Sequence, residues 1–552
     1  MERRKVIKNL AAALPALWLS KAMASGSMLN SFDNNAPIAK GPFKPTWDSL
    51  KAYQTPDWFR DAKFGIWAHW GPQCQPERGD WYARKMYIEG SEQYKFHVEK
   101  YGHPSKFGFK DVINEWKAEQ WDPEAIVSLY KRAGAQYFFA LANHHDNFDL
   151  YNSKYHKWNS VKFGPKKDII GGWAKAAKAN GMRFGVSVHA AHAWTWYETA
   201  QKADATGPLA GVPYDGNLTK AQGNGTWWEG LDPQELYAQN HPLSADSADT
   251  EKIHKQWDWA NGASLPSKAF CNNFLNRTID LLDTYEPDLI YFDDTALPLW
   301  PVSDAGLKIA AHMYNKSIKK HGQLNAVLFG KILTQEQQQC MVWDIERGQS
   351  NKIEPLPWQT DTCIGKWHYD RRLFDNHRYK SAKTVVQTLV DVVSKNGNLL
   401  LNVPLRGNGT MDNDAKLVVE EITGWMDINK EAIFDTRPWM VFGEGPAMET
   451  AAPLSAQGFN EGKGKPFGAQ DIRFTTKGNV LYAIVYGWPK DGKIIIKSLG
   501  TNAPDSGKKQ VNKVELLGNN NALTFEKNDT ALVVQLPEQK SKYIYAITLK
   551  MS

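Results

Sequence analysis

The residues with the clearest chemical potential are two adjacent carboxylates, Asp293 and Asp294, at the end of an apolar run. The run, residues 289–292, has the length of a buried parallel strand and follows a helix-like segment at 274–285. In a barrel of alternating strands and helices, the carboxyl ends of the strands carry the chemistry. Asp293 would point into the barrel mouth, whereas Asp294 suits a helix N-cap. An acid at this position can be catalytic or structural. Because there are two acids here, one can be catalytic and the other structural.

Histidine, tryptophan and acidic side chains gather at the ends of the other strands that the sequence predicts. They are His69 and Trp70 at the end of the first strand, Asp80 and Trp81 in the next loop, His144 and His145 after the second strand, His189 at the end of the third, Glu346 on the sixth, and Trp358 and Trp367 on and after the seventh. A sugar needs donors and acceptors for its hydroxyls, an aromatic wall, and two carboxylates flanking the anomeric carbon. This set of residue types favours a glycoside hydrolase, although any one histidine alone could be structural.

The same histidines and carboxylates could instead bind zinc, which would activate water. The sequence contains neither H-x-H nor H-E-x-x-H spacing. On an extended strand, the adjacent His144 and His145 would point to opposite faces and would not easily share one ion. We therefore expect no metal and no cofactor.

The elements that must position these residues alternate as strands with helices or loops, which predicts an α/β fold, a (β/α)8-like barrel. Strands are expected at 64–70, 137–143, 183–189, 289–293, 326–330, 341–346, 358–363 and 398–403, and helices at 124–133, 173–180, 274–285, 305–320 and 383–394. A doubly wound sheet is the main competitor, but no G-x-G-x-x-G follows the first strand. A Gly-, Asn- and Trp-rich insertion between residues 197 and 262 is expected to line the site or to form a lid.

The two ends of the chain differ from the barrel segment at 45–425. Residues 1–24 resemble an export signal, with a twin-arginine-like start, an apolar stretch and a small-x-small cleavage site. Residues 25–44 are expected to be a linker, and the mature protein is expected to be periplasmic or secreted. Residues 426–552 contain short alternating segments that predict an antiparallel β-sandwich.

Composition narrows the class further. The net charge of +6 with 23% charged residues is too diffuse to indicate nucleic-acid binding. The 23 Trp and 21 Tyr suit either stacking on sugars or a large aromatic core. The four cysteines form no C-x-x-C motif, so a zinc knuckle is not expected, and they can be paired or free. No later segment has transmembrane length, so no integral span is expected.

Five motifs from residue 64 to residue 403 match the pattern of one family. They are FGIWAHWG (64–71), GDWYARKMY (79–87), HHDNF (144–148), YFDD (291–294) and LVDVVSKNGNLLLNV (389–403). Together they resemble glycoside hydrolase family 29, the α-L-fucosidases. The resemblance extends from about residue 45 to the start of the predicted sandwich, and the last motif is the most specific.

This resemblance implies a retaining mechanism with a covalent fucosyl-enzyme, without a cofactor. It implies that Asp293 is the nucleophile. The implied sugar ligands are His69, His144, His145 and Trp81, with His189 and Trp367 on looser motifs, and the expected binding set also includes Trp70, Asp80, Tyr291 and Trp358. The expected partner is a fucosylated oligosaccharide or polysaccharide.

The sequence departs from the family pattern at the catalytic acid. Gln359 stands where some members carry a glutamate, and an amide cannot donate and regain a catalytic proton. Glu346 resembles the acid of another branch and is the first candidate, followed by Glu354 and Asp80. Three functions therefore stay open: an α-L-fucosidase, an α-L-galactosidase or related exo-glycosidase on the same scaffold, and a non-catalytic glycan-binding barrel.

Overall fold

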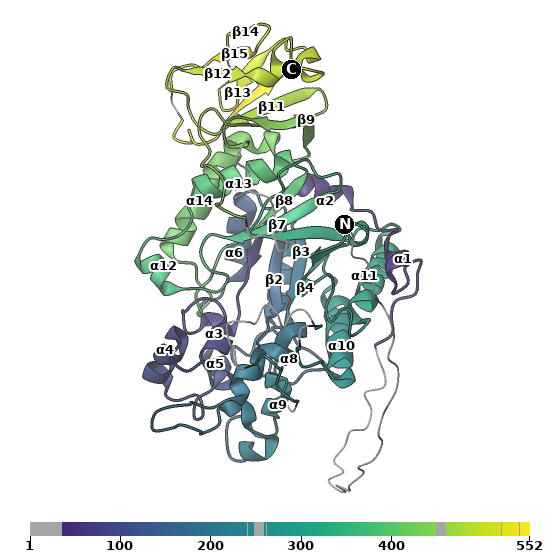
Figure 1. Ribbon diagram of the computed structural model, residues 1–552, viewed down its shortest axis with the longest axis vertical. Coiled ribbons are helices and arrows are strands. Elements are labelled where there is room, and N and C mark those ends of the chain that lie inside the picture. The colour runs from purple at the N-terminus through teal and green to yellow at the C-terminus, as the bar shows by residue number, and fades with distance from the viewer. Residues whose placement is uncertain are drawn as a thin grey trace, which may run out of the picture.

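The computed structural model describes residues 36–239, 241–247, 259–260, 262–448, 460–519, 521–539 and 541–552. Within them, a closed barrel of eight parallel strands is followed by a domain of two antiparallel sheets (Figure 1). This confirms the predicted fold class. The expected export signal at 1–24 lies outside the described residues, as does the first part of the expected linker. The described part of that linker packs on the barrel, because the Ala36 and Phe43 amides donate to side chains of the tenth and eleventh helices.

The barrel strands form close to where the sequence predicts them. They are β1 (Phe64–Ala68), β2 (Tyr137–Asn143), β3 (Arg183–Val188), β4 (Leu289–Thr295), β5 (Val327–Lys331), β6 (Val342–Glu346), β7 (Trp358–Cys363) and β8 (Gly397–Asn402). Each strand pairs in parallel with its neighbours, and β1 closes the ring by pairing with β8. Almost every strand residue is buried, as expected for a parallel sheet covered on its outer face.

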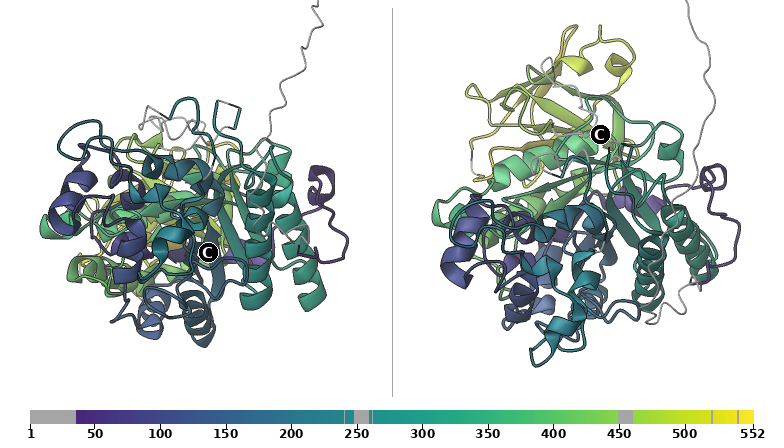
Figure 2. Two further views of the ribbon diagram at one scale, coloured as in Figure 1. Left: turned by 90° about the horizontal axis from the view of Figure 1, so that it is seen from below. Right: turned by 60° about the horizontal axis from the view of Figure 1, so that its bottom comes forward.

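Helices cover the outside of the barrel (Figure 2). The longer ones are α4 (Glu92–Tyr101), α6 (Pro123–Arg132), α7 (Ile169–Ala179), α10 (Lys268–Tyr285), α11 (Ala305–His321), α13 (Ala382–Ser394) and α14 (Asn413–Asn429). The shorter ones are α1 (Trp47–Leu50), α2 (Asp57–Ala62), α3 (Tyr82–Lys85), α5 (Phe109–Glu115), α8 (Ala193–Trp196), α9 (Pro233–Tyr237) and α12 (Arg371–Asp375). Several begin at a side-chain cap, such as Ser267 before α10 and Ser381 before α13. No long helix precedes or follows β6, so the alternation of strands with helices that predicts the other strands is weaker at β6 and β7.

The C-terminal domain contains a five-stranded and a three-stranded antiparallel sheet. Its strands are β9 (Arg437–Glu444), β10 (Ile472–Lys477), β11 (Val480–Val485), β12 (Lys493–Ile496), β13 (Val514–Leu516), β14 (Phe525–Lys527), β15 (Leu532–Gln535) and β16 (Ile547–Met551). The sequence did not predict β9 or β14. Pro438 and Gly443 make β9 a poor strand by pattern, and β14 has only three residues.

Helix α13 of the barrel packs against β9 and β10 of the C-terminal domain and lies between the two domains in Figure 1. Its buried Asp391 accepts a hydrogen bond from Arg473 of β10 and another from Lys395, both at 2.6 Å. Burial alone would raise the pKa of Asp391, but these two cations lower it. The carboxylate is therefore ionised and paired across the domain junction.

All four cysteines lie in the described residues, where each is buried and free. None of the described helices combines the length and the apolar character that crossing a membrane requires.

Candidate active site

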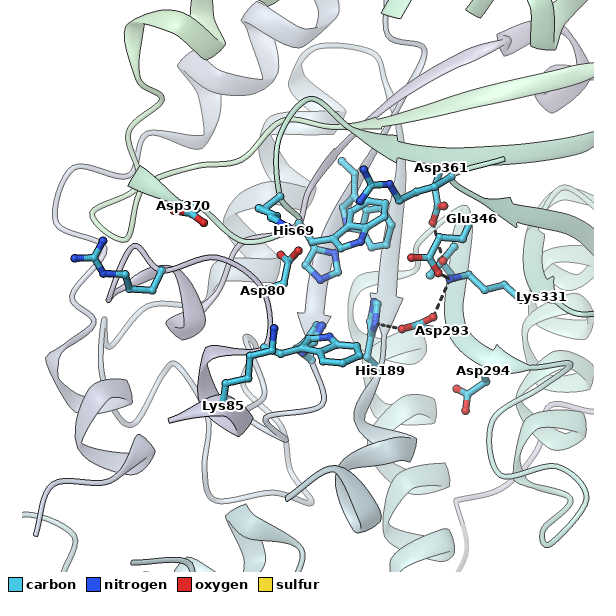
Figure 3. Close-up of a pocket in the computed structure, with 18 of the residues that line it drawn as sticks. His69, Asp80, Lys85, His189, Asp293, Asp294, Lys331, Glu346, Asp361 and Asp370 are labelled. Atoms are coloured by element: carbon cyan, nitrogen blue, oxygen red, sulfur yellow. Dashed lines mark hydrogen bonds and ion pairs between the residues drawn. The ribbon is translucent and has the colours of Figure 1, made fainter. Parts of the chain in front are cut away.

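A cavity of about 590 Å³ opens where the barrel strands end. Its walls are the ends of β1, β4, β5, β6 and β7 together with residues from the segments that follow β1, β2, β3, β5, β6 and β7 (Figure 3). The location agrees with the rule that barrel chemistry sits at the carboxyl ends of the strands.

Asp293 lies within β4, which continues to Thr295, so the strand itself fixes its carboxylate. Lys331 Nζ donates to Asp293 Oδ1 at 2.8 Å, and Asp293 Oδ2 lies 3.3 Å from His145 Nε2 and 3.6 Å from His189 Nδ1. Burial alone would raise the pKa of Asp293, but Lys331 and the two histidines hold it well below its usual range. The carboxylate is therefore ionised and available as a nucleophile.

Lys331, at the end of β5, links Asp293 to a second carboxylate. Its Nζ also donates to Glu346 Oε2 at 2.6 Å (Figure 3). The two bonded oxygens can be no further apart than the sum of these distances, about 5.4 Å. A separation of about 5–5.5 Å between carboxyl groups is typical of retaining glycosidases. Burial would lower the pKa of Lys331, but Asp293 and Glu346 raise it well above its usual range, so the bridge stays cationic.

Two further carboxyl groups lie beside this bridge, inside the barrel. Asp361 accepts a hydrogen bond from the Tyr291 hydroxyl at 2.7 Å, and Asp344 accepts one from Gln359 Nε2 at 2.9 Å. Gln359 in turn accepts a hydrogen bond from the Tyr137 hydroxyl. Burial raises the pKa values of Asp344 and Asp361. Gln359 is thus a buried partner of Asp344 and not a group facing the cavity.

Neutral histidines form part of the cavity wall. The ring of His69 packs edge-on against His144, His189 and His368, with centroids 4.8 to 5.1 Å apart. Burial lowers the pKa values of all four, to about 4 for His189 and about 3 for His368. Both ring nitrogens of His69 lack a hydrogen-bond partner among the described residues. The wall can therefore donate to and accept from uncharged hydroxyl groups.

One expectation about these histidines is wrong. His144 and His145 lie in a turn beyond Asn143, where β2 ends, and their ring centroids are 4.3 Å apart. Nitrogen atoms of His144, His145 and His189 all lie within 4.8 Å of one another, as do those of His69, His144 and His368. These trios could hold a metal ion. In the first trio, however, His145 Nδ1 is already hydrogen-bonded to the His189 carbonyl at 2.8 Å, and His145 Nε2 lies 3.3 Å from Asp293 Oδ2.

Asp80 and Trp81 face the cavity from the loop after β1. Asp80 Oδ1 accepts a hydrogen bond from the His368 backbone N–H at 2.8 Å. Burial raises the pKa of Asp80 to about 6, although this hydrogen bond and the nearby Lys366 and Lys85 oppose the rise. Asp80 therefore changes charge in mildly acidic solution.

The structure brings most of the predicted site residues together. Those that line the cavity are His69, Asp80, Trp81, His144, His189, Tyr291, Asp293, Glu346 and Trp367. His145 lies behind Asp293. Trp70 packs against Trp121 and donates to the Arg406 carbonyl, and Trp358 donates to the Lys395 carbonyl, so neither indole lines the cavity.

Glu354, the second candidate for the acid, lies away from the cavity. Its backbone N–H donates to the carbonyl of Lys395, just before β8 begins, so it sits at the amino end of the strands. Its carboxylate accepts a hydrogen bond from Ser350. Glu346 and Asp80 remain as candidates that face the cavity.

Sequence reasoning did not select Lys331, Asp361, Trp67 or His368, all of which belong to the site. Lys331 directly follows the predicted strand at 326–330, so the rule applied to the other strand ends would have found it. The insertion at 197–262 differs from expectation, because its described residues do not line the cavity. They contact the segment after β1 instead: the hydroxyl of Tyr87 donates to the buried Asp215 of the insertion, which also accepts from Tyr237 of the insertion itself.

A parallel barrel whose cavity holds two carboxylates this close together beside a neutral, aromatic wall has the features that a glycoside hydrolase needs. Comparisons with known proteins make this specific. The profile described as Alpha-L-fucosidase matches residues 31–431, and the one described as Alpha-L-fucosidase C-terminal domain matches residues 465–552. The chain therefore belongs to the α-L-fucosidase family.

Individual relatives are similar over almost their whole length. The Alpha-L-fucosidase of Dictyostelium discoideum is 23% identical, with 93% of this chain and 96% of the relative covered. The Tissue alpha-L-fucosidase of Homo sapiens is 24% identical, with 92% of each chain covered. The crystal structure of the Thermotoga maritima alpha-fucosidase in complex with a mechanism-based inhibitor matches with a TM-score of 0.67 at 25% identity, covering 92% of this chain and 99% of that one.

Proposed function

We propose that the protein releases terminal α-L-fucose from glycans with retention of configuration, through a covalent fucosyl-enzyme. The observation that carries the proposal is the single ammonium group that binds both Asp293 and Glu346. Because that contact limits the separation of the two carboxylates, one of them can attack the anomeric carbon while the other reaches the leaving oxygen.

In the first step, ionised Asp293 attacks the anomeric carbon and the bond to the leaving oxygen breaks. Glu346 gives its proton to that oxygen. Lys331 occupies Glu346 Oε2, which leaves Oε1 to carry the proton. In the second step, Glu346 takes a proton from water, the water oxygen attacks the anomeric carbon, and Asp293 leaves as a carboxylate.

The cavity wall assists by holding the sugar. The neutral histidines can bind its hydroxyls without competing for the charge of Asp293. Trp67, Trp367 and Tyr291 present aromatic surface to the apolar face of the ring and its methyl group. Contacts that strengthen as the oxocarbenium-like transition state forms would raise kcat.

Hydrolysis of an aryl α-L-fucoside tests the proposal. We expect turnover, with α-L-fucose as the first product seen by proton NMR before mutarotation. First formation of β-L-fucose would contradict retention. Absence of turnover on the fucoside together with turnover on the matching L-galactoside would contradict the choice of sugar.

We also propose that the protein is exported, on the basis of the pattern in residues 1–24. Replacing Arg3 and Arg4 together by Lys should keep the protein in the cytoplasm if a twin-arginine route is used. Normal export of that variant would contradict this route.

A further inference from the structure

The cavity has two sides with opposite charge. The strand-end side carries four carboxylates, Asp293, Asp294, Glu346 and Asp361, with two cations, Lys331 and Arg347, and Arg347 pairs with Glu461. The loop side carries four cations, Arg78, Lys85, Lys366 and Arg372, with the carboxylates Asp80, Glu92 and Asp370. Figure 3 shows Asp80, Lys85 and Asp370 across the cavity from Asp293, Glu346 and Asp361. A ligand that spans the cavity would thus meet an acidic region at one end and a basic region at the other.

The carboxylates of the loop side are already engaged. Arg372 donates two hydrogen bonds to Asp370, from Nε at 2.8 Å and from Nη2 at 2.7 Å, and it also pairs with Glu92. Asp80 is held by the His368 backbone and loses its charge in mildly acidic solution, because burial raises its pKa to about 6. These acids are therefore poor partners for the remaining cations.

Two of those cations form no ion pair within the part of the chain that the structure describes. The guanidinium of Arg78 lies over the ring of Phe96, 4.0 Å from its centroid, and the side chain of Lys366 is exposed at the cavity rim. Both act on Asp370, and Lys366 also acts on Asp80, through the electrostatic field. They belong to different loops, after β1 and after β7, and they converge on one side of the cavity.

The cavity is also larger than one deoxyhexose needs, since about 590 Å³ is typical of sites for drug-sized ligands. The fucosyl ring must sit at the strand-end side to reach Asp293. A leaving group that extends from there across the cavity would meet Arg78 and Lys366.

We propose that the loop side is a subsite for an anionic leaving group, a sugar that carries a sulfate ester or a carboxylate. This inference rests on the proposed fucosidase activity and adds the chemical class of the neighbouring residue. The strand-end carboxylates would repel such an anion, so the same charge distribution fixes which end of the substrate enters first.

The test compares three substrates that share one linkage: fucosyl-galactose, its 6-O-sulfate, and fucosyl-galacturonic acid. The readout is the ratio of kcat/KM for each anionic substrate to that for the neutral one. We expect a ratio of about ten or more for at least one anion at low salt, falling toward one in 0.5 M NaCl as the charges are screened. The anionic substrate with the larger ratio shows whether the subsite prefers a sulfate ester or a carboxylate.

Variants assign the effect to residues. Arg78→Gln and Lys366→Gln should each lower the ratio about three- to fivefold, and the double variant should bring it close to one. Lys352→Gln is the matched control, because Lys352 is exposed on the β6–β7 connection and does not line the cavity. It should leave the ratio unchanged. Because the ratio is internal to each variant, a partly unfolded sample does not imitate the effect.

A ratio near one in the wild-type protein, or equal losses on all three substrates in the variants, would overturn the inference while leaving fucosidase activity intact. Failure of the proposed function would look different, because an aryl α-L-fucoside would then also resist hydrolysis. A second measurement applies if the disaccharides are not cleaved: galactose 6-sulfate or galacturonate should inhibit aryl fucoside hydrolysis more strongly than galactose. Equal inhibition by all three would also overturn the inference.

Discussion

The strand-end side and the loop side of the cavity differ in how their charges are held. On the strand-end side, Lys331 binds Asp293 and Glu346 directly, and the backbone of the barrel fixes all three. On the loop side, Arg78 and Lys366 act on carboxylates that other groups already bind. Fixed, paired charges suit chemistry that needs sub-ångström placement, whereas unpaired charges near solvent suit recognition of a variable leaving group. Substitutions on each side of the cavity test this division.

The largest effect should follow removal of the nucleophile. Asp293→Ala should lower kcat/KM on an aryl α-L-fucoside at least about a thousandfold, because it removes the carboxylate on which the covalent intermediate forms. Added azide should restore turnover and give the inverted β-fucosyl azide, identified by NMR.

The neighbouring Asp294 provides the matched control. It pairs with His192 at 2.7 Å and points away from the Lys331 bridge. Asp294→Asn should retain activity within about tenfold of wild type. Equal losses for the two variants would contradict the assignment of Asp293.

Glu346→Ala should cost about a hundred- to a thousandfold on a substrate with a poor leaving group, because protonation of the leaving oxygen is lost. The loss should be smaller on an activated aryl fucoside, and azide should then give the retained α-fucosyl azide. Glu354→Gln is the control, since Glu354 lies at the amino end of the strands and should leave kcat/KM unchanged. Azide rescue absent in Glu346→Ala but present in an Asp80 variant would transfer the acid role to Asp80.

Lys331→Met should lower kcat/KM about tenfold to a hundredfold and should change its pH dependence. Lys331 holds the pKa of Asp293 well below its usual range. Without the cation, Asp293 and Glu346 repel each other and the pKa of Asp293 rises. The acidic limb of the kcat/KM profile should therefore move to higher pH. An unchanged acidic limb, with activity lost uniformly, would reduce Lys331 to a packing role.

The same contrast explains what the sequence could predict. The barrel and Asp293 were accessible, because apolar runs of strand length mark a buried parallel sheet and a polar residue at the end of such a run faces the mouth. Lys331 could have been found as a residue at a strand end, but its contacts could not be predicted. They join β4, β5 and β6 through side chains, and no periodicity encodes such contacts. His144 and His145 were misjudged for a related reason: the alternation rule was applied beyond Asn143, where the predicted and the observed strand both end and the chain turns. Loop positions such as His368 depend on tertiary contacts with the loop after β1, which local patterns do not encode.

The smallest effect should come from Asp80, the acid of the loop side. Asp80→Asn should keep kcat/KM on an aryl fucoside within about tenfold of wild type, and it should keep the alkaline limb of the pH profile. If Asp80 were the catalytic acid, that limb would lie near its pKa of about 6 and would vanish in the variant.

Asp80 has a raised pKa, so it is neutral below about pH 6 and charged above it. Preference for an anionic leaving group should therefore rise as the pH falls from 7 to 5 in the wild type, because the loop side becomes more positive. In Asp80→Asn that pH dependence should disappear, since the position is neutral throughout, and its persistence would show that another group on the loop side titrates.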